Sequence, residues 1–245
     1  MLLHIKRIKT MTRLRRYSFH VFMLVAIALL LTLGTWQVQR LQWKNARVEA
    51  IQAQLAEPEW PLTDVGALDE ADIYRRVSAT GTFLHDEEVH LYTGNIAYKS
   101  KIGYDIITPL VLTNGQVVLV DRGWVPAELK AQETRPETLV EGEEGLSAML
   151  MPGEQPGWFT PENDISGNLW FWLDIPAVSA SKNIELPPYF LRALITEGAE
   201  KALPRAGEAN IQLRNDHLHY AITWYALALI AAVFYGLFLR KVKKQ

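Results

Sequence analysis

The stretch YSFHVFMLVAIALLLTLGTWQVQ, residues 17–39, contains no Asp, Glu, Lys or Arg, and neither does YAITWYALALIAAVFYGLFL, residues 220–239. A helix needs about 20 apolar residues to cross a hydrocarbon core about 30 Å thick. Both stretches reach that length, so they predict two transmembrane helices, one near each end of the chain. Residues 40–219 lie between them and are numerous enough to form one globular domain.

Charged residues are distributed unevenly along the chain. Residues 1–20 hold six Lys and Arg without an acid, and residues 240–245 hold four more, again without an acid. The intervening segment carries the other 15 Lys and Arg against all 27 acids, a net charge of −12. Because cations are retained on the cytoplasmic side of a membrane, we expect cytoplasmic termini (1–16 and 240–245) and an outer domain (40–219) on the opposite side.

The acidic outer domain and the absence of cysteine exclude several classes of function. Nucleic-acid binding needs clustered cations on the protein surface, so no nucleic acid is expected as a partner. Membrane lipid is the expected surrounding of the two spans. Because the sequence has no cysteine, it has no disulfide, thiolate metal site, iron–sulfur cluster or cysteine nucleophile.

A cleaved signal peptide is the alternative to a first transmembrane helix. The basic start and the apolar residues 21–33 fit one, but residues 34–40 (GTWQVQR) offer no small-x-small cleavage site. The uncharged stretch is also longer than the apolar core of a usual signal peptide. We therefore predict a retained membrane anchor.

The outer domain is predicted to consist mainly of strands. Apolar residues keep helical spacing over residues 40–55, which extends the first helix until Pro58 and Pro61 end it. Beyond them, the pattern predicts strands at 73–83, 87–92, 102–112, 116–124, 169–175 and 189–195, an irregular loop at 151–168 and a short helix at 176–182. The predicted fold class is a membrane protein with two terminal transmembrane helices and an outer domain of mainly antiparallel β structure, closed or nearly closed into a barrel, with short helices.

One hairpin has a strong local signal. Asn114-Gly115 stands between two β-rich runs, which is typical of a two-residue type I′ turn with positive φ at both central residues. The run Val117–Val120 that follows lacks polar alternation, so we expect this strand to be buried on both faces.

His217 is the first candidate for a functional side chain. It stands where the second span meets the outer interface. On a helix it shares a face with Tyr220 and Trp224, whereas His219 points roughly the opposite way. The partial positive charge of a helix N-terminus disfavours imidazolium, and a neutral imidazole is a metal ligand. Apolar and aromatic neighbours suit a flat hydrophobic macrocycle such as haem, with His217 as an axial ligand of the iron.

Trp36, Gln37 and Arg40 lie at the outer end of the first span, at the same predicted depth as His217. Arg40 has the fork of donors that suits a propionate carboxylate. Simpler interpretations exist for all of them: His217 helps to anchor the helix behind an N-cap residue, Trp36 belongs to an aromatic belt, and Arg40 snorkels to the interface. Residue types alone favour these simpler interpretations.

The outer domain offers no convincing catalytic set. Arg76 and Arg122 are expected to pair with Asp121 or Asp105, which is a structural role. No serine stands in a nucleophile-elbow context, and no glycine-rich phosphate loop is present. The chain is therefore not expected to be an enzyme.

Five segments together resemble the Surfeit locus protein 1 family. They are GTWQVQR with WK (34–40, 43–44), YRRV with GTF (74–77, 81–83), GY with TPL (103–104, 108–110), VDRGWVP (120–126) and NDHLHYAITW (215–224). They stand in the order of the family and span nearly the whole chain. The histidine of the family's Asn-x-His-Leu-x-Tyr-Ala motif falls on His217, and His219 occupies one of the x positions.

This resemblance implies a two-span protein of the bacterial inner membrane with its β-rich domain in the periplasm. It implies an assembly factor for haem-copper cytochrome c oxidase that binds haem a and assists its insertion into subunit I. The expected partners are cytochrome c oxidase subunit I and haem a synthase. His217 is then the axial ligand of the haem iron. The residues expected to bind haem a are His217, Trp224, Tyr220, Trp36, Gln37 and Arg40. The alternative is a membrane scaffold that stabilises an oxidase intermediate without binding haem.

Overall fold

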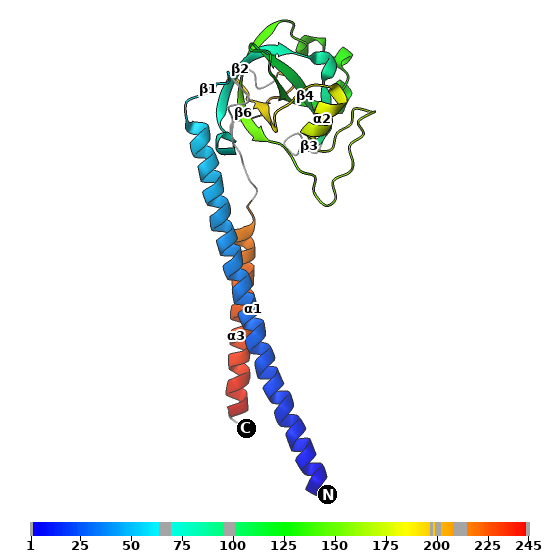
Figure 1. The fold of residues 1–245 in the computed structure, drawn as a ribbon. Coiled ribbons are helices and arrows are strands. Elements are labelled where there is room, and N and C mark those ends of the chain that lie inside the picture. Colours follow the sequence, from blue (N-terminus) through cyan, green and yellow to red (C-terminus); the bar gives the residue numbers. More distant parts are fainter. Residues whose placement is uncertain are drawn as a thin grey trace. The chain divides into compact units, whose positions relative to one another are not determined.

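The computed structural model describes residues 2–63, 70–95, 101–196, 198, 202–207 and 215–243. The chain divides into two compact units, one made of residues 1–49 with 212–245 and the other of residues 50–211. The first unit is a pair of long helices, and the second is built on a β-sheet (Figure 1).

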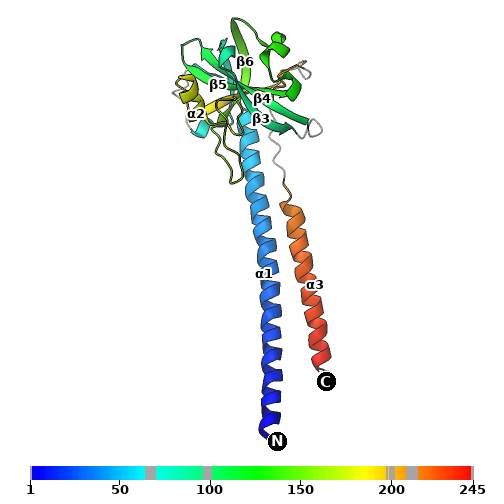
Figure 2. The same ribbon diagram turned by 90° about the vertical axis from the view of Figure 1, so that its right-hand side faces the viewer.

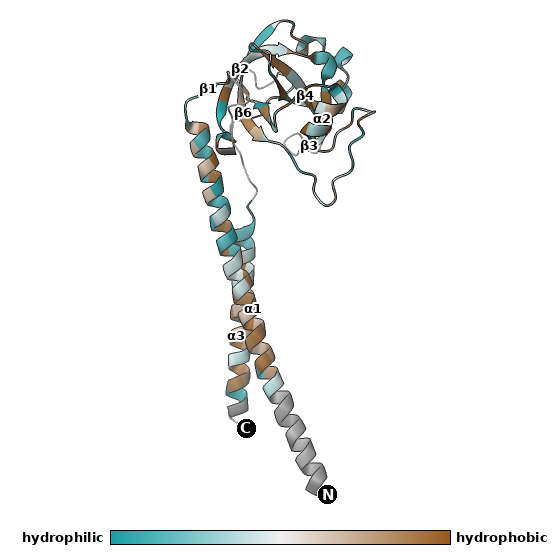
Figure 3. Cartoon of the chain, viewed as in Figure 1, coloured by the Kyte–Doolittle hydropathy of each residue, from teal (hydrophilic) through white to brown (hydrophobic). Residues whose placement is uncertain are grey.

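The helix pair consists of α1 (Leu2–Ala56) and α3 (His217–Lys243). The last residues of α1, from Ala50 on, belong to the second unit. Both helices are long and apolar enough to cross a membrane, over Tyr17–Ala56 and His217–Lys241, and only 6% of the most apolar window of each is buried in the protein. Figure 3 shows brown, apolar residues along the middle of α1 and along much of α3, and teal, hydrophilic residues in the last turns of α1 and at the start of α3. The prediction of two long apolar helices near the termini is confirmed.

The sheet domain contains seven strands within the described residues. They are β1 (Trp60–Pro61), β2 (Arg76–Phe83), β3 (Val89–Asn95), β4 (Lys101–Leu112), β5 (Val117–Pro126), β6 (Glu143–Pro152) and β7 (Tyr189–Ala193). Their order is β1-β2-β6-β7-β5-β4-β3, and an additional pairing of β2 with β4 closes five of these strands into a ring. Among these strands, β1–β2 and β5–β7 pair in parallel and the other pairs are antiparallel. The predicted sheet, mainly antiparallel and closed on itself, is confirmed.

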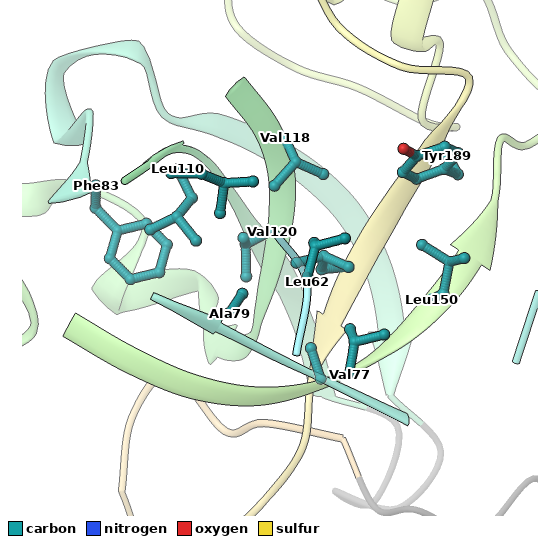
Figure 4. Close-up of a cluster of buried hydrophobic side chains, with 12 residues drawn as sticks. Leu62, Val77, Ala79, Phe83, Leu110, Val118, Val120, Leu150 and Tyr189 are labelled. Atoms are coloured by element: carbon teal, nitrogen blue, oxygen red, sulfur yellow. The ribbon is translucent and has the colours of Figure 1, made fainter. Parts of the chain in front are cut away.

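The main core of the sheet domain is formed by apolar side chains from the strands of this ring. Along β2 buried and more exposed residues alternate. On β5, eight consecutive residues are buried and only the two end residues are half-buried, which confirms the burial predicted for this strand. Figure 4 shows side chains of this cluster gathered between the strands: Leu62, Val77, Ala79, Phe83, Leu110, Val118, Val120, Leu150 and Tyr189.

A second apolar cluster includes residues of α2 (Ile175–Lys182) and of the sheet. The helix begins where the Oδ1 atom of Asp174 accepts the N–H of Ala177 at 3.1 Å, which satisfies one of the free donors of the first turn. It ends at Asn183, which adopts the left-handed conformation with φ of 53°. The short helix predicted at 176–182 is confirmed.

Two strands begin two or three residues later than predicted. β2 begins at Arg76 rather than at residue 73, because Tyr74 has a positive φ of 72° and cannot continue a strand. β3 begins at Val89 rather than at residue 87, because His85–Glu87 form a 3₁₀ turn.

β6 and the two-residue β1 are absent from the predicted strands, and the strand predicted at 169–175 is wrong. The sequence of β6, EEGLSAMLMP, has no β-branched residue, so pairing with β2 and β7 must define it. Phe171 and Trp172 instead donate their backbone N–H groups to the side chain of Asn163, at 2.8 and 3.4 Å. The irregular loop predicted from residue 151 begins after Pro152.

The turn between β4 and β5 differs from the predicted type I′ turn. Gly115 has a φ of 85°, whereas Asn114 is not among the described residues with positive φ. The N–H of Gly115 donates to the carbonyl of Leu112, and the N–H of Leu112 donates to that of Gln116, both at 2.8 Å. The loop therefore has three residues, a type I turn followed by a left-handed glycine. The Oδ1 atom of Asn114 favours this geometry because it accepts the N–H of Gln116 at 2.9 Å.

The ion pair of Asp121 has a different partner from the one predicted. The Nε atom of Arg192 on β7 lies 3.0 Å from the Oδ2 atom of Asp121 on β5. Arg122 donates to a backbone carbonyl instead. Within the described part of the chain, neither Arg76 nor Arg122 forms an ion pair with Asp121 or Asp105. The parallel pairing of β5 with β7 brings Arg192 to this position, and spacing in the sequence does not reveal it.

Candidate functional site

One face of α1 follows a repeat of three and four residues. Its members are half-buried or buried, whereas most residues between them are exposed, and this spacing is typical of a helix that packs along another helix. The residues of this seam are Met23, Ile27, Leu30, Gly34, Gln37, Leu41, Lys44 and Val48.

Four of the polar contacts between described residues, on or beside this seam, join α1 to α3 or to Asn215, which precedes α3. They are His20 Nδ1 to Tyr235 Oη at 2.9 Å, Thr35 Oγ1 to Tyr225 Oη at 3.0 Å, Gln37 Oε1 to His217 Nδ1 at 2.7 Å, and Asn45 Oδ1 to Asn215 Nδ2 at 2.8 Å. Residue numbers rise along α1 as they fall along α3, so the helices are antiparallel (Figure 2). Hydrogen bonds between helices are a usual means of fixing register where the surroundings are apolar.

The ring of Tyr225 packs against α1 at a glycine. Gly34 is buried, and a Cβ atom built on it would lie 2.8 Å from the Cε1 atom of Tyr225. Small residues at helix interfaces permit such an approach because they bring the backbones together. Gly34 is one helical turn from Gln37, so this contact also sets the distance across which Gln37 reaches α3.

His217 is the first residue of α3. The carbonyl of Asp216 accepts the N–H of Tyr220 at 3.3 Å, so Asp216 stands at the N-cap position. The imidazole is half-buried, and its Nδ1 atom lies 2.7 Å from the Oε1 atom of Gln37, a residue that is only 9% exposed. Because an amide oxygen accepts hydrogen bonds, Nδ1 is the donor of this bond, and in a neutral imidazole the lone pair is then on Nε2.

Trp224 lies on the same face of α3 as His217, seven residues along the helix. This face also carries Ala221 and Ala228, each only 2% exposed, so it is the face that packs on α1. Trp224 itself is half-buried. His219 points away from this face and is exposed, which makes the two neighbouring imidazoles different in their surroundings.

The remaining predicted site residues are more exposed. Trp36 is 54% exposed and Tyr220 is 55% exposed. The guanidinium of Arg40 lies 4.1 Å over the ring of Trp43, on its own helix. In the part of the chain that the structure describes, no ring contact or ion pair joins Trp36 or Arg40 to His217 or Trp224.

The structure thus brings together Gln37 and His217, with Trp224 beside them on the same helix face. Gly34, which determines how closely the helices pack at this point, is not among the predicted site residues. The spacing of three and four residues along α1 is visible in the sequence, and it identifies both Gly34 and Gln37 as seam positions. No group of three or more His, Asp or Glu suited to a metal ion is present among the described residues. In this arrangement the Nε2 atom of His217 is the group whose chemistry suits a metal ligand.

Comparisons with known proteins agree over both units. The sequence model of the SURF1 family matches residues 24–229, which include Gln37, His217 and Trp224. The chain is 30% identical over 228 residues to the SURF1-like protein of Rickettsia felis, and the match covers 91% of this chain and 97% of that protein. It is 34% identical over 224 residues to the SURF1-like protein of Monosiga brevicollis, covering 85% and 82%. It is 31% identical over 238 residues to Surfeit locus protein 1 of Takifugu rubripes, covering 91% and 98%.

Proposed function

Because this chain belongs to the SURF1 family, we propose that it is a membrane-bound assembly factor for haem-copper cytochrome c oxidase. In this proposal the protein receives haem a, with haem a synthase as the donor, and assists its insertion into subunit I. Haem a is a cargo, and the protein itself performs no catalytic step. The basic termini and acidic middle of the chain support an orientation with both termini in the cytoplasm and the sheet domain in the periplasm of a bacterial inner membrane.

The observation that carries the proposal is the 2.7 Å hydrogen bond between His217 and Gln37. A histidine that ligates a metal usually donates its other ring N–H to a fixed acceptor, which orients the ring and selects the tautomer. Gln37 supplies that acceptor from α1. The Nε2 atom of His217 then has the lone pair that an axial ligand of haem iron requires, so the donor set fits one-sided ligation.

The neighbouring residues fit a hydrophobic cargo. Trp224 supplies an aromatic surface on the same helix face as His217. Trp36 and Tyr220 keep more than half of their surface exposed and are available to cover a macrocycle. Arg40, stacked on Trp43, offers guanidinium donors to a propionate carboxylate. A single imidazole ligand in an open site suits a protein that must release its cargo.

A scaffold without haem is the second candidate. The bond between Gln37 and His217 is one of the four polar contacts described above for this helix pair. In the scaffold interpretation, all four contacts hold the helices in register and have no further role. On that view the site supports docking of an oxidase intermediate, and the free Nε2 atom has no ligand.

Haem retention separates the two candidates. The full chain is co-expressed with the enzymes of haem a synthesis, purified in mild detergent, and its pigment extracted and identified. We expect His217→Ala to reduce haem a to the background of the preparation while membrane insertion and protein level stay the same, since the apolar stretch determines insertion. Gln37→Leu should weaken retention by about tenfold, as loss of an orienting partner does at metal sites.

His219→Ala is the matched control, because it removes a neighbouring imidazole that faces away from the seam. It should keep most of the haem. Full haem occupancy in His217→Ala, or loss in His219→Ala alone, would refute the assignment of the ligand. Equal haem content in the wild-type protein and all three variants would favour the scaffold.

A further inference from the structure

The loop between β6 and α2 displays two adjacent aromatic side chains on the surface of the sheet domain. Trp158 and Phe159 are fully exposed, and both are large apolar groups. Figure 1 shows this loop, in yellow-green, extending away from the strands of the sheet domain. Single exposed apolar residues are common on proteins, but an adjacent Trp and Phe, both without any cover, form a concentrated apolar surface.

The turn that carries these side chains is ordered. The N–H of Thr160 donates to the carbonyl of Gly157 at 3.1 Å, and the Oγ1 atom of Thr160 accepts the N–H of Gly157 at 2.9 Å. Trp158 and Phe159 are therefore the two central residues of a turn that is closed by two hydrogen bonds. Proline precedes and follows the turn, at Pro156 and Pro161, and restricts its backbone further. The turn fixes the backbone of both aromatic residues before any partner arrives, which lowers the entropy cost of binding.

The loop is also attached to the domain at both of its ends. At the first end, the Oε2 atom of Glu154 accepts the N–H of Leu173 at 3.0 Å. At the second, the Oδ1 atom of Asn163 accepts the N–H of Phe171 at 2.8 Å. These bonds join the loop to the segment that leads into α2, so the exposed turn is supported by the fold.

A groove of about 430 Å³ lies at the base of the same loop. Trp172, Ile165 and Ala177 supply apolar surface to it, and Glu162 and Asp174 supply carboxylates. No Lys or Arg is among the described residues that line it. Residues 153–168 as a whole contain three acids and no Lys or Arg. An aromatic tip beside an acidic groove is complementary to an apolar recess that is bordered by cations.

The negative charge of the loop favours a protein partner over a lipid surface. Segments that dip into membranes combine aromatic residues with Lys and Arg, because bilayer surfaces carry anionic lipids. The loop instead places Glu162 and Asp164 within five residues of Phe159. The Oδ1 atom of Asp164 accepts bonds from Gly167 N and Ser166 Oγ, at 2.9 and 2.8 Å, which favour its charged form. Carboxylates next to the aromatics oppose insertion into such a membrane.

We infer that the loop of residues 153–168 is a docking surface for a protein whose apolar recess, bordered by Lys or Arg, takes up Trp158 and Phe159. Aromatic side chains at the centre of an interface commonly provide most of its binding energy. The carboxylate of Glu162 pairs with a cation at the border of the recess. The choice of a component of the assembling oxidase as this partner rests on the proposed function, whereas the surface itself does not depend on haem.

Site-specific photo-crosslinking in cells that produce the oxidase tests this inference. The photoreactive amino acid p-benzoylphenylalanine replaces Trp158 in the full chain, and adducts are identified by mass spectrometry. Ile102, which is 55% exposed on β4 and lies outside the loop, is the matched position. We expect position 158 to form an adduct with an oxidase subunit, about tenfold above that of position 102. Glu162→Lys should reduce this adduct about fivefold, as reversal of a border charge weakens association. Glu137→Lys, at another exposed acid, should leave it unchanged.

Several results would overturn the inference: adducts with lipid or with a second copy of the chain, equal yields from positions 158 and 102, or adducts only with proteins outside the oxidase. Haem content of the same preparations keeps the two proposals separate. Bound haem a without an oxidase adduct would refute the docking surface and leave the proposed haem function intact. An oxidase adduct that depends on Glu162, in a protein without haem, would support the docking surface and refute the proposed haem function.

Discussion

The sheet domain and the helix pair use buried polar groups in different ways. In the sheet domain, the guanidinium of Arg135 is completely buried and donates to the carbonyl of Leu129 at 3.0 Å, to the Oγ1 atom of Thr138 at 3.1 Å and to the carboxylate of Glu88. In the helix pair, the half-buried imidazole of His217 has one hydrogen bond to the residues that the structure describes, and its partner is Gln37.

This difference indicates what each region is built for. A buried charge is tolerated when several partners compensate the loss of hydration, and it then holds the surrounding loops in one arrangement. An imidazole with one partner is oriented but keeps a free nitrogen, which is the condition for binding a ligand. The sheet domain therefore depends on its polar network for stability, whereas the helix pair offers an oriented imidazole for the cargo of the proposed function.

The largest effect should follow from removing the buried cation of the sheet domain. Burial by itself would raise the pKa of Glu88, but hydrogen bonds from His90 and Arg135 hold it below its usual value. Arg135→Ala leaves this carboxylate buried with one compensating partner fewer, so we expect a loss of about 3–5 kcal/mol in the free energy of unfolding. Thermal melting of the full chain, followed by near-UV circular dichroism, measures it. Arg47→Ala, at an exposed arginine of α1, is the control and should change stability by less than about 0.5 kcal/mol. An equally small change in the free energy of unfolding of Arg135→Ala would show that the buried polar network does not stabilise the sheet domain.

A pH dependence should also belong to the sheet domain. Burial, together with the charge of nearby Asp121, raises the pKa of Asp105 to about 8 from an ordinary value of 3.8. The folded state thus holds the proton more tightly than the unfolded state. This contribution to stability is complete below the ordinary pKa and is lost as the pH rises through about 8. The slope is at most about 1.4 kcal/mol per pH unit. In Asp105→Asn, melting temperatures measured across this window should vary less with pH. A slope as steep as that of the wild-type protein would assign the titration to another group.

In the helix pair, loss of close packing should have a smaller effect. Gly34→Leu places side-chain atoms where the ring of Tyr225 lies, which should destabilise helix association by about 1–3 kcal/mol. The chain has no cysteine, so Asn45→Cys with Asn215→Cys gives a clean disulfide assay of helix contact. We expect Gly34→Leu to lower the disulfide yield. Gly236→Leu should not, because a Cβ atom there has no neighbour within 4 Å. Unchanged yield in Gly34→Leu would show that this glycine does not set the helix separation.

The smallest effect is expected at the turn between β4 and β5. A Cβ atom on Gly115 meets nothing within 4 Å, but the φ of 85° is strained for a β-branched residue. Gly115→Val should therefore destabilise the sheet domain by about 1–2 kcal/mol. Gly145→Val is the matched control, since Gly145 lies on β6 without a positive φ and its Cβ atom would be 3.8 Å from Thr80 Oγ1. Equal melting temperatures for the two variants would contradict the left-handed conformation of Gly115.

Patterns of composition were enough to predict the coarse fold. The two long uncharged stretches, the turn signal at Asn114-Gly115 and the unbroken apolar run of β5 depend on residues near one another in the chain, so they can be recognised locally. The strand β6 could not be recognised in this way, because its sequence has no β-branched residue and its partners β2 and β7 define it. The exact turn type also escaped prediction, because the side chain of Asn114 selects among several compatible turns.

For the candidate site, helical periodicity by itself determined that His217 and Trp224 share a face and that His219 lies opposite. Only the tertiary structure decided that Gln37 binds the Nδ1 atom of His217, and that Arg192, rather than a nearer arginine, pairs with Asp121. The reason is physical. Which side chains share a face follows from the geometry of a single helix, whereas a partner 180 residues away depends on how two elements pack and on the register in which they meet.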